Sequence, residues 1–181
     1  MTTFIWVAVV VVAVVALAAV GYLVLQQQRR GHLRERFGPE YERAVAEHDN
    51  RRDAEQELLD RERRHSELDI HPLTDESRDT YANRWTEVQE RFVDAPGFAV
   101  TEADQLVTAV MAERGYPTED FGERLSTLSV GHAATLDHYR TAHEISGRAA
   151  RKEASTEDLR QAMVHYRALF EELLHETSRG R

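Results

Sequence analysis

Histidine and glutamate are the residues of this sequence whose types and spacing could bind a metal ion. The chain has 181 residues, nine of them histidine. Two pairs, Glu62 with His65 and Glu172 with His175, have the Glu-x-x-His spacing that di-iron helical bundles use, and such a site also needs two further carboxylates directed into the core. Glu172 lies off the apolar stripe of its predicted helix, and Glu62 and His65 lie in a strongly charged segment. The sequence therefore favours solvated surface side chains at all four positions.

Other catalytic chemistry has no motif in this chain. The patterns G-x-G-x-x-G, G-x-x-x-x-G-K-[ST], G-x-S-x-G and H-E-x-x-H do not occur. There is no cysteine, which excludes disulfides, thiolate nucleophiles and thiolate metal sites. The one lysine, Lys152, lies in a polar link, where it is hydrated rather than desolvated for Schiff-base chemistry. His143 falls on an apolar helix face, where a histidine bonded to a core neighbour is commoner than a ligand.

The charge of the chain indicates which partners it can bind. The net charge is −9, and residues 1–36 contribute +3 through four arginines and one glutamate, so the remainder carries −12. Nucleic-acid binding needs clustered cationic side chains that neutralise phosphates. We therefore expect no nucleic-acid partner. We also expect the acidic chain after residue 36 to be repelled by an anionic lipid surface and to lie away from it.

The first part of the sequence has the composition of a membrane-spanning helix. Residues 4–25 contain no charge and nothing more polar than Trp6 and Tyr22, and about 20 apolar helical residues can cross a bilayer core. The nearby positive charge follows in a basic segment at 26–38, so the positive-inside rule places residues 1–3 outside the cell membrane and the bulk of the chain in the cytoplasm. The residues predicted to lie at the membrane interface are Trp6, Tyr22, Arg29, Arg30, Arg34 and Arg36.

A cleaved signal peptide is the alternative for the same stretch. Ala16-Leu17-Ala18 supplies a small-x-small cleavage pattern, and cleavage would produce a secreted helical protein. Three features favour a retained anchor: the basic n-region is missing, the apolar run exceeds the usual ~7–15 residues, and arginines follow it directly.

Residues 39–70 are predicted to form one long charged helix. Gly38-Pro39 interrupts the preceding helix, because proline is tolerated in a first helical turn and disfavoured in the interior. Acid-first pairs four residues apart, such as Glu47 with Arg51, support a helix that buries little surface. Two interpretations stay open, a stalk that forms a weak coiled coil and the solvated face of an ordinary bundle helix.

Residues 74–176 predict a small antiparallel bundle of amphipathic helices, followed by a basic tail at 177–181. Apolar side chains recur there at spacings of three and four, without the period-two alternation of strands, so the fold class is all-α. Three-, four- and five-helix topologies stay open. The expected core positions are Tyr81, Trp85, Val88 and Phe92; Ala103, Leu106, Val107, Val110 and Met111; Leu136, Tyr139, Ala142 and Ile145; and Leu159, Met163, Tyr166, Phe170 and Leu173.

The ends of these helices are also predicted. Thr74 and Ser155 are expected to cap helix N-termini, and Gly115 a C-terminus. Phe121 is expected in a helical element of one or two turns, and the next helix is expected to begin near His132. The triplets His138-Tyr139-Arg140 and His165-Tyr166-Arg167 echo each other, which we interpret as chance rather than duplication.

Four stretches carry a resemblance to a known family. They are RFGPEYERAV from Arg36, RRHSELDIHPL from Arg63, RFVDAPGFAVTEADQLVTAVMAERGYP from Arg91 and STEDLRQAMVHYRALFEELL from Ser155. Together they resemble an uncharacterised family of single-pass membrane proteins of actinobacteria, over most of the chain that follows the apolar stretch. The resemblance implies an anchored helical architecture and no reaction.

These observations predict a membrane-tethered cytoplasmic helical module that acts in interaction or scaffolding and is not an enzyme. Its expected partners are the lipid bilayer, anionic lipid headgroups, and a protein partner or a second copy. No cofactor is expected. The alternative from another class is a metal- or ligand-binding helical protein that uses histidine and glutamate.

Overall fold

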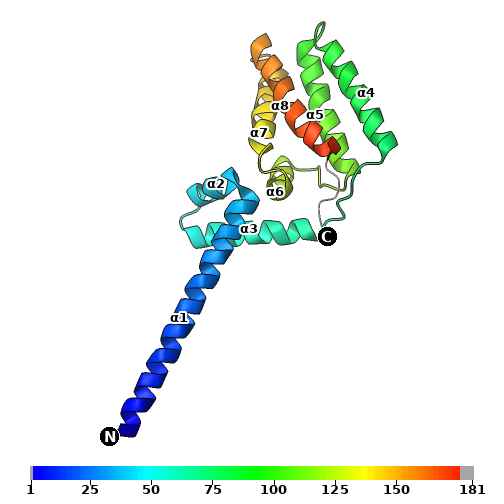
Figure 1. Cartoon of the computed structure of the whole chain (residues 1–181). Coiled ribbons are helices and arrows are strands. Elements are labelled where there is room, and N and C mark those ends of the chain that lie inside the picture. The colour runs from blue at the N-terminus through cyan, green and yellow to red at the C-terminus, as the bar shows by residue number, and fades with distance from the viewer. Residues whose placement is uncertain (1, 176–181) are drawn as a thin grey trace. The chain divides into compact units, whose positions relative to one another are not determined.

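The computed structural model describes residues 2–175, and in the first helix it describes the side chains of Trp6 and of residues 16 onward. These residues form eight α-helices and no strand, which confirms the all-α fold class (Figure 1). The predicted basic tail at 177–181 lies outside the described residues. The chain divides into two compact units, Met1–Leu58 and Leu59–Arg181.

The first unit begins with the long helix α1 (Thr2–Phe37), followed by α2 (Pro39–Glu47) and the first half of α3 (Arg51–Ser66). Gly38 separates α1 from α2 with a positive φ of 48°, and Pro39 is the first residue of α2. A left-handed φ suits glycine, and proline is well tolerated at the first helical position. The predicted interruption at Gly38-Pro39 is therefore confirmed.

Half of the side chains of the predicted membrane span at 4–25 lie outside the described residues, namely those of 4, 5 and 7–15. Within the described part of the chain, no helix combines the length and apolar character that a membrane crossing needs.

The prediction of one continuous helix over 39–70 is wrong, because the chain breaks between α2 and α3. His48 has extended backbone angles, and its Nδ1 lies 2.8 Å from the Ala44 carbonyl oxygen at the end of α2. Asn50 caps the start of α3, since its Oδ1 accepts a 3.0 Å hydrogen bond from the Asp53 backbone N–H. An asparagine cap satisfies a backbone donor that a new helix leaves unpaired. Glu47 and Arg51 consequently belong to different helices.

The charged segment also buries an apolar face, so it is not a fully solvated stalk. Buried apolar side chains come from all three helices of the first unit: Leu33 and Phe37 from α1, Tyr41 and Ala44 from α2, and Ala54 and Leu58 from α3.

The second unit contains a helical bundle. Its helices, besides the end of α3, are α4 (Asp75–Arg91), α5 (Pro96–Glu113), α6 (Phe121–Gly131), α7 (Leu136–Ala150) and α8 (Thr156–His175). α5 packs against α4, α7 and α8, and α7 packs against α8 and α6. The topology left open by the sequence is thus four long helices with the shorter α6 beside α7 (Figure 1).

Cross-helix contacts give the helix directions. In the α4–α5 hairpin, Tyr81 hydrogen-bonds Glu113 and Arg91 pairs with Glu102, so the two helices run antiparallel. The α7–α8 hairpin is antiparallel as well. α5 and α8 run parallel. Asp104 contacts Tyr166, and Arg114, which follows Asp104 in the chain, contacts Leu173, which follows Tyr166.

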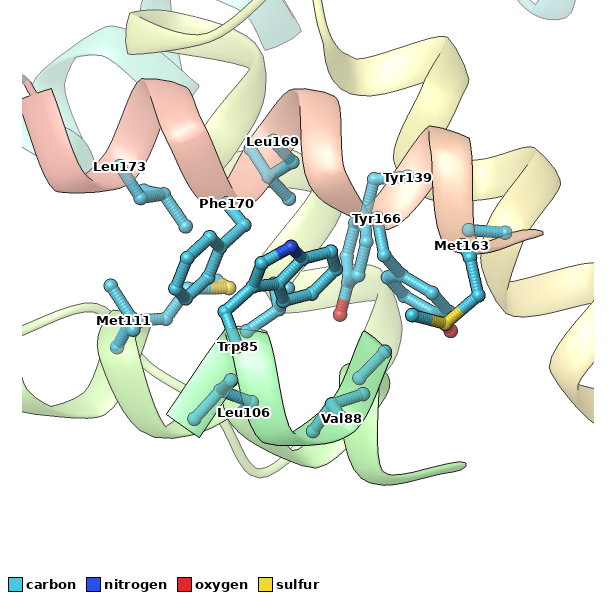
Figure 2. Close-up of a cluster of buried hydrophobic side chains, with 14 of the residues drawn as sticks. Trp85, Val88, Leu106, Met111, Tyr139, Met163, Tyr166, Leu169, Phe170 and Leu173 are labelled. Atoms are coloured by element: carbon cyan, nitrogen blue, oxygen red, sulfur yellow. The ribbon is translucent and has the colours of Figure 1, made fainter. Parts of the chain in front are cut away.

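The core of the bundle is the predicted one. All the expected positions of α4, α5, α7 and α8 are buried except Phe92, which is partly buried against the same cluster. The rings of Trp85 and Phe170 stack with centroids 4.6 Å apart and an interplanar angle of 20° (Figure 2). This offset-stacked geometry adds to the stabilisation from burial alone. The Trp85 indole N–H is buried with no hydrogen-bond partner among the described residues.

Most helix ends follow the sequence, and two differ. Thr74 accepts from the Ser77 backbone N–H, and Ser155 from that of Asp158, as predicted. α6 spans 11 residues rather than one or two turns. It begins after Asp120, which accepts from the Glu123 backbone N–H, and it continues to Gly131. α7 begins at Leu136 rather than near His132.

Gly115 ends α5 in the way the sequence predicts. Its φ is +92°, its N–H donates to the Ala112 carbonyl, and the Tyr116 N–H donates to the Met111 carbonyl. These two bonds form a Schellman motif, which favours glycine at the left-handed position. The Asp69 carbonyl oxygen would lie 2.3 Å from a Cβ at Gly115. Both the backbone angle and the space therefore require glycine.

We predict that Gly115→Ala destabilises the protein strongly, by more than about 2 kcal/mol, because it combines left-handed strain with a backbone clash. Gly147→Ala is the matched control. Gly147 lies inside α7, and a Cβ there would meet only the Arg151 Nη1 at 3.7 Å, so alanine should stabilise by about 0.4–1 kcal/mol. Chemical denaturation of both variants tests the pair, and equal stabilities would contradict the assignment.

Candidate functional site

Of the predicted membrane-interface residues, the two aromatic ones are exposed on α1. Trp6 and Tyr22 have exposed fractions of 71% and 57%. Arg52, at the start of α3, donates a 3.3 Å hydrogen bond to the Tyr22 hydroxyl. This contact was not predicted, because Arg52 lies 30 residues from Tyr22 in a segment that was predicted to be part of a long charged helix.

Of the four predicted arginines, two form ion pairs with glutamates. Arg30 donates from Nε to Glu55 Oε1 at 3.1 Å, and Arg34 pairs with Glu42 at 3.3 Å. Arg29 and Arg36 are exposed.

Tyr41 and Glu55 join these helices. The Tyr41 hydroxyl donates to the Glu55 carboxylate at 2.8 Å, and the Arg34 guanidinium lies 5.1 Å from the Tyr41 ring centroid. Burial, together with the hydrogen bond to Glu55, raises the pKa of Tyr41. Glu55 thus accepts hydrogen bonds from Arg30 of α1 and Tyr41 of α2, and it holds the end of α1 against α2 and α3. Nothing in the sequence singles out Glu55, which is one of many glutamates in a charged run.

A polar cluster lies among α5, α6, α7 and α8, centred on Asp104. The Tyr166 hydroxyl donates to Asp104 Oδ1 at 2.9 Å, and His143 Nδ1 lies 3.6 Å from the same oxygen. The His143 ring stacks on Phe121 with centroids 3.7 Å apart. Arg124 donates to the Thr108 hydroxyl at 3.0 Å. His143 is therefore a core-edge histidine with a carboxylate neighbour.

The electrostatics of this cluster favour a charged Asp104. Burial alone would raise the pKa of Asp104, but the nearby His143 imidazole, the hydrogen bond from Tyr166 and the charge of Arg124 outweigh it, so the pKa lies below its usual value. Burial raises the pKa of Tyr139 to about 12, and burial together with Asp104 raises that of Tyr166 further. Both phenols stay protonated, and the hydrogen bond from Tyr166 to Asp104 links α8 to α5.

A second polar group surrounds His132, which is 1% exposed. Its Nδ1 lies 2.9 Å from Glu172 Oε1, and its Nε2 lies 2.9 Å from the Tyr116 hydroxyl. The carboxylate only accepts, so Nδ1 carries the hydrogen. Thr135 donates to the other Glu172 oxygen at 2.5 Å. The chain of contacts fixes the segment between α6 and α7 against α8.

One member of each Glu-x-x-His pair is engaged elsewhere. Glu172 binds His132 and Thr135, and His65 lies edge-on to the Tyr116 ring with centroids 6.4 Å apart. Nowhere among residues 2–175, so far as their side chains are described, do three or more histidine, aspartate or glutamate side chains gather in a way that could hold a metal ion.

A pair of histidines on the outside of the α7–α8 hairpin was not predicted as a contact. The Nδ1 atoms of His138 and His165 lie 2.7 Å apart, with ring centroids separated by 5.0 Å. Burial and the proximity of His138 lower the pKa of His165. The echoed triplets that contain these residues therefore face each other across the hairpin.

A shallow groove between α4 and α5 is lined mainly by charged side chains, including Arg84, Glu87 and Arg91, and has a volume of about 70 Å³. Small-molecule sites usually measure ~300–1,000 Å³. The groove is therefore a surface feature rather than a pocket for a substrate.

Comparison of the chain with protein-family models, with curated proteins and with solved structures gives no match. The resemblance to actinobacterial single-pass membrane proteins stays a prediction.

We predict that Asp104→Asn lowers the free energy of unfolding by about 1–3 kcal/mol at neutral pH, because the charged acceptor of Tyr166 is lost. The folded-state pKa of Asp104 is lowered, so the carboxylate stabilises the fold above its unfolded pKa of about 3.9. That contribution is lost as pH falls through the folded pKa, and the two proteins should then converge.

Asp79→Asn provides the control, since Asp79 is exposed on α4 and its substitution should change stability by less than about 0.5 kcal/mol. Unfolding curves from pH 7 to pH 2.5 make the comparison. A constant difference between wild type and Asp104→Asn over this range would contradict the role of the charged form.

Proposed function

We propose that this protein is a membrane-tethered helical module whose bundle binds a protein partner at the cytoplasmic face of a bilayer. The observation that carries the proposal is the exposed apolar surface of α1. Leu17, Val20, Leu23 and Leu25 have exposed fractions of 72%, 57%, 60% and 60%. Because successive residues of a helix turn by about 100°, these side chains point to several sides of α1. One partner helix would cover only one side, whereas lipid covers all of them.

The basic residues that follow support contact with anionic headgroups. Arg29 and Arg36 are exposed, and each arginine near an anionic surface contributes about 1 kcal/mol. The contact of Arg52 with the Tyr22 hydroxyl brings a further cation to the same level of α1. Tyrosine and arginine are typical of the interface where a spanning helix leaves the lipid.

The charge distribution supports the orientation. The arginines follow the apolar stretch, and the chain after residue 36 carries −12. The positive-inside rule then places the arginines and the bundle in the cytoplasm. The acidic bundle is repelled by an anionic leaflet, which favours its presentation to a protein.

The turn between α4 and α5 offers a contact surface on the bundle. Val93 and Phe98 lie on either side of this turn, with exposed fractions of 83% and 58%. The cost of exposing two large apolar side chains at a helical tip is removed when a partner covers them. Arg91 lies over the Phe98 ring at 5.9 Å and gives this apolar tip a charged border.

We predict that the full chain resists carbonate extraction from membranes and that Leu17→Arg with Val20→Arg releases it. A charged side chain near the centre of a spanning helix costs about 2.5–3.5 kcal/mol. Val93→Arg is the matched control, since it also replaces an exposed apolar residue but should leave the protein in the membrane. Extraction of the unmodified chain would contradict the anchor, and a mature N-terminus at Ala19 would favour the secreted alternative.

Orientation is tested by single cysteines at Thr3 and at Gln161, which is exposed on α8. The chain has no native thiol, so labelling reports only the engineered positions. An impermeant reagent applied to intact cells should label Thr3→Cys and not Gln161→Cys. The reverse result would place the bundle outside.

The binding surface is tested by a photoreactive amino acid at Phe98. Irradiation of cells should give one defined protein adduct, or a dimer of this chain, and Val93→Glu should reduce its yield at least tenfold. The same photoreactive residue at Asn83, exposed on α4, is the control. Equal adducts at both positions would contradict a specific surface at the α4–α5 turn.

A further inference from the structure

The histidine pair on the outer side of the α7–α8 hairpin has the spacing of two metal ligands. Metal–imidazole bonds measure ~2.0–2.1 Å, so two nitrogens at right angles around one ion lie about 2.9 Å apart. The Nδ1 atoms of His138 and His165 lie 2.7 Å apart. The backbone of the hairpin therefore already holds the two donors at nearly the separation that a shared ion needs.

The two rings can adjust to a common ion. His138 is exposed and His165 is half-buried, and the ring torsion of histidine is broad. Without a metal, one Nδ1–H must donate to the other Nδ1, because two lone pairs at this distance repel. The acceptor ring already carries its hydrogen on Nε2. A metal ion can take the place of the shared hydrogen when the donor ring moves that hydrogen to its own Nε2, so one neutral ring changes tautomer and no proton is lost to solvent.

The two histidines lie on the solvent side of the hairpin, and the neighbouring side chains that the structure describes do not bind them. The next residue on each helix, Tyr139 and Tyr166, is buried in the core. The nearby charged side chains pair with each other on their own helices, Arg140 with Asp137 at 3.3 Å and Arg167 with Glu171 at 2.7 Å. No third ligating side chain joins the pair within the described part of the chain, so water must fill the remaining positions of a bound ion.

We propose that His138 and His165 form a surface site for a divalent first-row transition metal, with two cis imidazole nitrogens from the protein and water as the other ligands. Imidazole suits copper, nickel and zinc, and the general order of affinities places Cu²⁺ highest. Structural zinc sites have four protein ligands, so this two-ligand site is an open one from which the ion can exchange. The site does not depend on the proposed membrane anchor or on the apolar tip at Val93 and Phe98.

The experiment uses the full chain in detergent micelles, titrated with CuCl₂ by calorimetry and followed by electron paramagnetic resonance. We expect one tight Cu²⁺ per chain, with hyperfine structure from two nitrogens. His138→Gln and His165→Gln should each weaken binding at least tenfold and leave one nitrogen. Ni²⁺ and Zn²⁺ should bind more weakly than Cu²⁺ at the same residues.

His175→Gln is the matched control, because His175 is exposed on the same helix as His165, and its affinity should equal that of wild type. Unchanged circular dichroism and thermal unfolding of the metal-free variants show that the hairpin is intact. Equal affinity in wild type and in the doubly substituted chain would overturn the proposal, and so would a wild-type spectrum without a nitrogen pair.

Discussion

The bundle depends on the packing of the apolar stripe of α8 against the other helices. The side chains of this stripe pack against α5 and α7, and Phe170 reaches α4 through the stacked ring of Trp85 (Figure 2). Trp85 remains in this core although its N–H lacks a described partner, which indicates that burial and stacking outweigh the lost hydrogen bond. The polar group around His132 then attaches the α6–α7 segment to α8 through Glu172, and the hydrogen bond from Tyr166 to Asp104 joins α8 to α5. Removing α8 would expose most of the core at once.

Helix α1 has no equivalent stripe. Most apolar side chains of the bundle are covered by other helices of the same unit, but those of α1 from Leu17 to Leu25 are exposed. Its other end is held differently, through Leu33, Phe37 and the contacts of Glu55 with Arg30 and Tyr41. A single helix is thus continuous from an uncovered apolar segment into a folded, ion-paired cap. This contrast underlies the proposed tether, because lipid supplies cover that the described protein does not.

The apolar stripes and caps, which recur or act within one helix, could be predicted from the sequence. The contacts between residues distant in the chain could not. The stripes of α4, α5 and α8 were visible because their apolar spacing follows the helical period, and Thr74, Ser155 and Gly115 were visible because caps have local signatures. The break at Asn50 had such a signature too, with Asp53 three residues later, but the acid-first pairs around it suggested continuity. Glu55, Arg52, His132 and the His138–His165 contact could not be derived, since nothing local distinguishes them from solvated side chains. The role of the predicted interface residues on α1 cannot be derived from local sequence either, because it depends on what surrounds the helix.

The most direct measurement of the central claim is the depth of α1 in a bilayer. Spin labels at Leu17 and at Gln27, in full-length protein reconstituted in liposomes, can be compared for collisions with oxygen and with a water-soluble paramagnetic complex. Oxygen concentrates in hydrocarbon and the complex in water. We predict that the label at Leu17 collides with oxygen and not with the complex, while the label at Gln27 collides with the complex. Equal access of the complex to both labels would show that water surrounds α1, and would contradict the tether.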